Sequence, residues 1–153
     1  MTLSSLRRSK TFSVQEANRS LPLVRSIVQD WVALSAQVAE RRERVAYLMA
    51  GRDPDAQDLY TDELTHVEKE LKQSSESLDR YVGELNQLGI EPRDASIGLV
   101  DFPAVLDDRE VYLSWELGES EVRYWRELGE SYDQRRLLED GHLEAAGSDS
   151  GAS

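Results

Sequence analysis

Apolar residues recur every three or four positions over roughly the first ninety residues, which is the spacing of helices that bury one face. Ser13 and Glu16 have the spacing of a capping box, so a helix is expected to begin near Val14. Pro22 should interrupt this helix, because a proline inside a helix lacks an amide hydrogen and crowds the preceding turn. We therefore expect a short helix, a kink, and a second helix over about residues 22–50.

A second helical stretch follows, in which apolar positions alternate in steps of four and three residues over four heptads. These positions are Tyr60, Leu64, Val67, Leu71, Ser74, Leu78, Tyr81, Leu85 and Leu88. The spacing is typical of a coiled-coil seam, and Gly89 can supply a left-handed C-terminal cap. Residues 20–52 hold five basic and three acidic side chains, whereas residues 53–88 hold three and ten. These opposite charges favour pairing, so the two stretches are predicted to form a long antiparallel hairpin.

After the helices the apolar pattern changes to a period of two, which is typical of β-strands with one buried face. Residues 98–106 and 110–117 are predicted to form a β-hairpin around a turn at residues 107–109. Placing Asp107 opposite Glu110 makes one face of this hairpin entirely apolar. That face pairs Phe102 with Trp115, Ala104 with Leu113, and Leu106 with Val111.

A short helix over residues 121–128 is expected after the β-hairpin, with Ser120 as its N-cap. The predicted fold class is therefore α+β and mainly α. It combines a long, coiled-coil-like antiparallel helical hairpin with a C-terminal β-hairpin and a short helix.

These elements form one domain over residues 12–138, with the helical hairpin in 12–89 and the β-hairpin and short helix in 90–138. Residues 1–11 are expected to be flexible. The acidic residues 139–153 are expected to be disordered, because small polar side chains cannot bury enough apolar surface to order a chain.

Composition narrows the class of protein. The chain has 153 residues, of which 39% are apolar, and this suits one domain with a modest core. It contains no cysteine, which excludes disulfides, thiolate metal sites and a cysteine nucleophile. No apolar run approaches the length of a membrane span, so we expect a cytoplasmic protein. The net charge of −12 repels phosphate backbones and anionic lipids, so neither nucleic acid nor a membrane is an expected partner.

Two carboxylates meet in the predicted strand register, because Asp101 would lie opposite Glu116. Like charges across a strand pair destabilise a sheet unless something neutralises them. Ser114 and Glu119 are close enough in sequence to extend this cluster, and Arg126 comes from the segment that must fold back beside it. Three interpretations remain open: the carboxylates diverge into solvent, an arginine neutralises them, or they bind a ligand or a divalent metal. An all-oxygen site would favour magnesium, calcium or manganese, but no His and Glu ligand spacing supports a metal, so no cofactor is assigned.

Several short motifs follow one another in a recognisable order. They are Phe12-Ser13, Glu16-Ala17-Asn18, Leu21-Pro22-Leu23, GLVDFPA at 98–104, EVYL at 110–113, Trp115, LGE at 117–119 and Tyr124-Trp125. Over about residues 12–137 the chain resembles an uncharacterised bacterial family, domain of unknown function 2203. The family pattern has a cysteine at the position of Ser114 and a histidine at that of Arg126. The resemblance therefore implies a metal site in relatives and, in this chain, an arginine charge in place of the metal; it implies no established activity.

No catalytic motif is complete in the sequence, and the favoured function is a non-catalytic interaction or scaffold protein. A two-helix pair leaves much of each apolar stripe uncovered, so we expect a second copy, giving a dimer, or another protein to cover it. The residues expected to carry self-association are Trp31, Leu64, Val67, Leu71 and Leu78. The alternative is a small metal- or ligand-binding protein, an enzyme included. Its site would consist of Asp101, Ser114, Glu116, Glu119 and Arg126.

Overall fold

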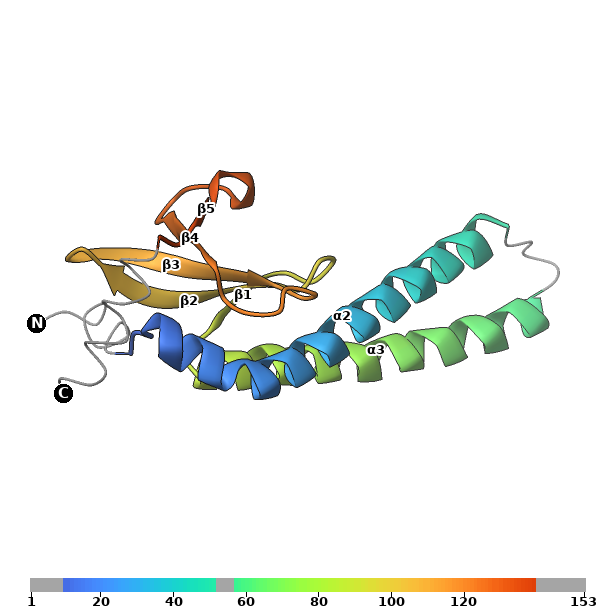
Figure 1. Ribbon diagram of the computed structural model, residues 1–153. Helices are drawn as coiled ribbons and strands as arrows, with labels where there is room; N and C mark the ends of the chain where they lie inside the picture. Colours follow the sequence, from blue (N-terminus) through green and yellow to red (C-terminus); the bar gives the residue numbers. More distant parts are fainter. Residues whose placement is uncertain (1–9, 52–56, 140–153) are drawn as a thin grey trace, which may run out of the picture.

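Two long helices and one antiparallel sheet make up the protein (Figure 1). The computed structural model describes residues 10–51 and 57–139, and of residues 57–60 it describes the backbone. Helices α2 (Val14–Ala50) and α3 (Gln57–Gln87) run in opposite directions as a hairpin, and the sheet packs on one end of it. The fold is α+β and mainly helical, as predicted.

The expected flexible start and disordered tail, residues 1–11 and 139–153, lie almost entirely outside the described part of the chain. Nothing in the structure therefore tests those two predictions. Within the described residues, no helix is long and apolar enough to cross a membrane.

Each strand of the sheet pairs with the next one along the chain, in the order β1-β2-β3-β4-β5. The strands are β1 (Glu91–Asp94), β2 (Leu99–Leu106), β3 (Arg109–Glu116), β4 (Tyr124–Glu127) and β5 (Arg136–Leu137), with the 3₁₀ turn η1 (Tyr132–Gln134) before β5. The predicted β-hairpin is therefore the centre of a larger meander.

Helix α2 begins where the capping box predicts. The Ser13 side-chain oxygen accepts from the amide of Glu16 at 3.0 Å, and Glu16 Oε1 accepts from the amide of Ser13 at 2.8 Å. The second of these bonds holds the pKa of the Glu16 carboxyl below its usual range. The predicted break at Pro22 is wrong, because α2 continues through it. Leu21 and Val24 are buried in the core on either side of this exposed proline, and their burial outweighs the lost hydrogen bond.

Replacing Ser13 with alanine should lower the free energy of unfolding by about 1 kcal/mol, because an amide of the first turn loses its acceptor. Thermal unfolding followed by circular dichroism would measure the loss. Ser26→Ala is the matched control, since Ser26 is exposed in the middle of α2. Equal effects of the two variants would contradict the role of the cap.

The register of the central β-hairpin differs from the prediction by two residues. Leu106 pairs with Arg109, and Phe102 therefore pairs with Leu113 rather than Trp115. The physical reason is a two-residue turn in which Asp107 and Asp108 both adopt left-handed backbone angles, with φ of 52° and 64°. Such a turn matches the right-handed twist of the strands better than a three-residue turn does.

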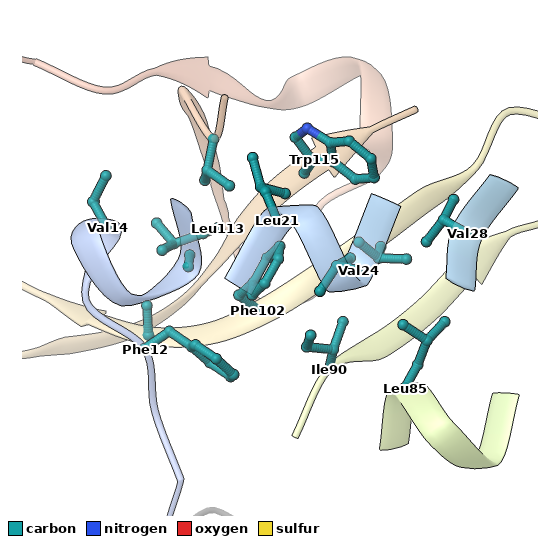
Figure 2. Close-up of a cluster of buried hydrophobic side chains, with 14 of the residues drawn as sticks. Phe12, Val14, Leu21, Val24, Val28, Leu85, Ile90, Phe102, Leu113 and Trp115 are labelled. Atoms are coloured by element: carbon teal, nitrogen blue, oxygen red, sulfur yellow. The ribbon is translucent and has the colours of Figure 1, made fainter. Parts of the chain in front are cut away.

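A shift by two leaves every side chain on its predicted face, because strand side chains alternate with period two. The predicted apolar face is therefore the buried one. Figure 2 shows Phe102, Leu113 and Trp115 from this face meeting Leu21 and Val24 of α2. Leu85 of α3 and Ile90 belong to the same core, and Phe12 packs edge-on against Phe102 with ring centres 5.2 Å apart.

The predicted short helix at 121–128 is wrong, because residues 124–127 form strand β4. Strand β3 leaves one edge open after pairing with β2, and β4 fills it with Leu113 opposite Trp125. In an extended strand Trp125 packs against the core while the next residue, Arg126, points to the opposite face. Pairing with an open sheet edge thus prevails over the helical spacing of the apolar residues in this segment.

Candidate functional site

The face of the sheet turned away from α2 carries a buried polar cluster. Asp101 lies opposite Ser114 on the neighbouring strand, and Tyr112 lies opposite Arg126. Asp101 and Ser114 are fully buried, and Arg126 is 7% exposed. In Figure 1 the segment that holds β4, η1 and β5 lies on this side of the sheet. Neighbouring strands therefore bring these side chains together at a position that is shielded from solvent.

Two arginines neutralise Asp101. Arg93 Nε donates to Asp101 Oδ2 at 2.6 Å, and Arg126 Nη2 donates to the same oxygen. Arg93 also binds Glu91, while Arg126 Nη1 donates to the carbonyl oxygen of Glu130 at 2.5 Å. We name Asp101, Arg93, Arg126 and Ser114 the buried arginine–aspartate cluster.

The Tyr112 ring supports both guanidinium groups of this cluster. Its centre lies 4.9 Å from the central carbon of Arg93 and 5.2 Å from that of Arg126, which suits cation–π attraction. Its hydroxyl donates to Glu91 Oε1 at 3.2 Å. One aromatic side chain thus orients the two groups that hold Asp101.

Burial raises the pKa of the Asp101 carboxyl above its usual range, because removing the carboxylate from water penalises the charged form. The Arg93 and Arg126 guanidiniums act in the opposite direction. The stability of the carboxylate at this position therefore depends on its arginine neighbours.

A second polar cluster lies beside the first and contains the other predicted carboxylates. Arg135 donates to both carboxylate oxygens of Glu119, at 3.1 and 2.8 Å. Its guanidinium lies between the rings of Tyr124 and Tyr132, at 4.2 and 4.6 Å from their centres. The Tyr132 hydroxyl donates to Glu116, and this bond raises the pKa of Tyr132. This arrangement ties the chain after β4 to the end of β3.

The predicted site residues therefore divide into two groups. Asp101, Ser114 and Arg126 come together, and Arg126 supplies positive charge to Asp101, which is one of the three interpretations left open by the sequence. Glu116 does not lie opposite Asp101, because Leu99 is its partner in the observed register. It belongs with Glu119 in the second cluster, where Arg135 is the nearby cation.

Arg93 and Tyr112 are functional neighbours that the sequence reasoning missed. Arg93 lies where the pairing of β1 with β2 shifts between Pro92 and Asp94, in a strand of four residues that is too short to show a period. A buried aspartate requires a positive charge nearby, and Arg93 is the nearest arginine before Asp101 in the sequence. This requirement is the sequence feature that could have indicated Arg93.

Chemically, the carboxylates of Asp101 and Glu119 are each already hydrogen-bonded to arginine. Within residues 10–51 and 57–139, no group of three or more His, Cys, Asp and Glu side chains is placed to hold a metal ion. The charge-assisted hydrogen bonds of Asp101 with Arg93 and Arg126 thus connect β2 to β1 and to β4.

The residues predicted for self-association lie along the helical hairpin. Trp31 and Val67 are buried within a single chain, at 7% and 8% exposure. Leu64, Leu71 and Leu78 are half-buried, and Leu78 packs against the main core. Two leucines of α3 therefore remain partly uncovered away from that core.

Comparison with known proteins places the chain in a family without assigning an activity. No curated protein matches the chain, and no solved structure matches it either. The family described as "Uncharacterized conserved protein (DUF2203)" matches residues 10–138, a range that includes both long helices and all five strands. Because this match covers most of the chain, the protein belongs to the domain of unknown function 2203 family.

Proposed function

We propose that this protein is a non-catalytic interaction module that self-associates through the outer part of its helical hairpin. We name that part the arm and define it as residues 33–50 of α2 and 57–77 of α3. In Figure 1 the arm extends beyond the end of the sheet. We place the protein in the cytoplasm, because a chain without cysteine suits a reducing compartment.

The observation that carries this proposal is the incomplete burial of the arm. Val38 and Val67 are buried, but they lie outside the main core and have only the narrow interface of two helices to cover them. Apolar neighbours along the same stripes are only half-buried, namely Leu34, Val45, Leu64 and Leu71. A second pair of helices would complete their burial, as in a four-helix bundle.

A groove beside the seam gives the arm a further feature of an interface. Its volume is about 160 Å³, and it is lined by Leu34, Arg41, Glu70, Gln73, Ser74 and Ser77. The groove exists because Ser74 occupies a seam position where most neighbours are leucine or valine. Arg41 donates to the hydroxyl of Ser74 at 2.9 Å, which places a polar pair inside an otherwise apolar stripe. Polar groups at such positions fix the alignment of helices, here that of α2 against α3.

The charges of the two helices favour a second copy as the partner. Residues 20–52, which include most of α2, are net basic, and residues 53–88, which contain α3, are strongly acidic. In a two-fold arrangement the basic helix of each copy can lie against the acidic helix of the other. This complementarity supports self-association over binding to an unrelated chain.

The full-length protein should form a dimer or a larger assembly at micromolar concentration in light scattering coupled to size exclusion. Replacing Leu64 and Leu71 together with glutamine should weaken the assembly at least about 100-fold, because two apolar contacts are lost from each copy. Circular dichroism should show that the double variant keeps its helices.

Leu23→Gln is the matched control, since Leu23 is 54% exposed on α2 outside the arm. It should leave the assembly unchanged. A wild-type protein that stays monomeric at about 100 µM, roughly the range of weak specific complexes, would overturn the proposal. So would an equal loss of assembly in the control and in the double variant.

A further inference from the structure

Three buried polar atoms of the arginine–aspartate cluster have no hydrogen-bond partner among the described residues. They are Asp101 Oδ1, Ser114 Oγ and Arg126 Nε. The residues that carry them are 0%, 0% and 7% exposed. Buried polar groups are nearly always paired, so three on one sheet face call for a shared explanation. The proposed function of the arm has no bearing on them.

The contacts around these atoms show why no other protein group pairs with them. Asp101 Oδ2 accepts from both Arg93 and Arg126, so the other carboxylate oxygen has no arginine donor. Arg126 uses Nη1 on the carbonyl of Glu130 and Nη2 on Oδ2. Arg126 and Asp101 therefore share a single hydrogen bond. They do not form the two parallel hydrogen bonds of a bidentate pair, which we call a fork.

Strand register brings the third atom to the same place. Ser114 is the direct partner of Asp101 across β2 and β3, and its side chain is on the same face. A short serine side chain does not close the remaining gap to a hydrogen bond with Oδ1. The three unpaired atoms thus belong to adjoining side chains.

Their chemistry specifies the ligand. A carboxylate oxygen requires a donor, the Nε–H group of an arginine requires an acceptor, and a hydroxyl serves as either. A cation would be repelled by the guanidinium, and an anion by the carboxylate. Because all three residues are buried, there is access only for the smallest neutral molecule that both donates and accepts. We propose that Asp101 Oδ1, Ser114 Oγ and Arg126 Nε bind one buried water molecule.

A competing arrangement needs no ligand. A small rotation of the Arg126 side chain would let Nε donate directly to Asp101 Oδ1 and complete the fork. Ser114 Oγ would then remain buried without a partner. The two arrangements differ in what the serine hydroxyl contributes to stability, and this difference can be measured.

Ser114→Ala tests the proposal through the sign of its effect on thermal stability. If water bridges the cluster, the variant loses a satisfied hydrogen bond and its melting temperature should fall by about 3–6 °C. If the fork forms instead, the variant removes an unpaired hydroxyl, and the melting temperature should rise or stay the same. The latter result would overturn the proposal. Ser120→Ala, in the exposed loop after β3, is the control and should leave the melting temperature unchanged.

A crystal structure of the full chain at about 1.5 Å resolution provides a test that does not depend on the variant folding. A density peak within hydrogen-bond distance of Asp101 Oδ1, Ser114 Oγ and Arg126 Nε would support the proposal. A direct bond from Nε to Oδ1 with no such peak would refute it.

Discussion

Replacing Arg126 with alanine should lower the free energy of unfolding by about 3–5 kcal/mol, because it leaves the carboxylate of Asp101 buried with reduced compensation. Asp101 is fully buried, and a neutral water molecule would not supply the positive charge that its carboxylate loses. Arg93 still contacts Oδ2, which places the expected loss toward the lower end of this range. Chemical denaturation at neutral pH would measure it.

The loss should depend on pH in a defined direction. Burial already holds the pKa of Asp101 above its usual range, and removing Arg126 takes away one of the groups that oppose this shift. A carboxyl whose pKa is raised by folding favours the folded state at low pH, and this contribution disappears as the pH rises through the folded-state pKa. The deficit of Arg126→Ala should therefore be largest at neutral pH and should shrink as the pH falls through that pKa.

Two further variants separate this explanation from a general effect of losing an arginine. Arg109→Ala removes an exposed arginine that pairs with Glu127 on the same sheet, and it should cost less than about 1 kcal/mol. Adding Asp101→Asn to Arg126→Ala removes the uncompensated charge and should recover part of the lost stability. Equal costs for Arg126→Ala and Arg109→Ala would show that Asp101 does not depend on its buried partner.

The helical half of the fold was predictable because its signals are local. The capping box at Ser13 and the heptads of α3 specify helices without reference to the rest of the chain. Pro22 misled the prediction, because its penalty is also local whereas the compensation comes from tertiary burial of Leu21 and Val24. Sequence spacing shows the energetic cost of a proline inside a helix but not the tertiary burial that compensates for it.

The sequence pattern predicts which side chains lie on each face of the sheet, but it does not predict which residues pair across the strands. A shift of two residues keeps Phe102 and Leu113 on the apolar face, so the alternation of polar and apolar residues allows both registers. The choice depends on the backbone of Asp107 and Asp108, and aspartate signals a left-handed turn less strongly than glycine or asparagine. Strand β4 depends on an open edge of β3, which exists only after the first hairpin has formed.

The buried cluster shows the same limit. The predicted register places Asp101 opposite Glu116, and this pair of like charges, together with the family resemblance, points to Arg126 as a source of positive charge. Arg93 could not be found in this way, because its position depends on the irregular pairing of β1. The sequence therefore indicates one arginine partner, although it places that arginine on a helix rather than on β4, and only the folded chain identifies the second one.

Gly98→Ala should destabilise the protein by about 2–5 kcal/mol, because a side chain at this position is both strained and obstructed. Gly98 has a φ of +69°, and a Cβ atom there would lie 2.6 Å from Cβ of Leu117. It would also lie 3.0 Å from Val28 and 3.1 Å from Val32. This glycine is where the sheet approaches α2 most closely among the described glycines, so the added carbon would force the layers apart.

Gly118→Ala is the control that isolates the steric part of this effect. Gly118 has a φ of +107°, which is less favourable for alanine than the angle of Gly98, but a Cβ atom there would meet nothing within 4 Å. Backbone strain alone would therefore make Gly118→Ala the more damaging variant. Close packing of the sheet on α2 requires the opposite order, and denaturation curves of the two variants would decide between them. If Gly118→Ala is the less stable of the two, the contact of Gly98 with Val28 and Val32 is not tight enough to set the spacing of helix and sheet.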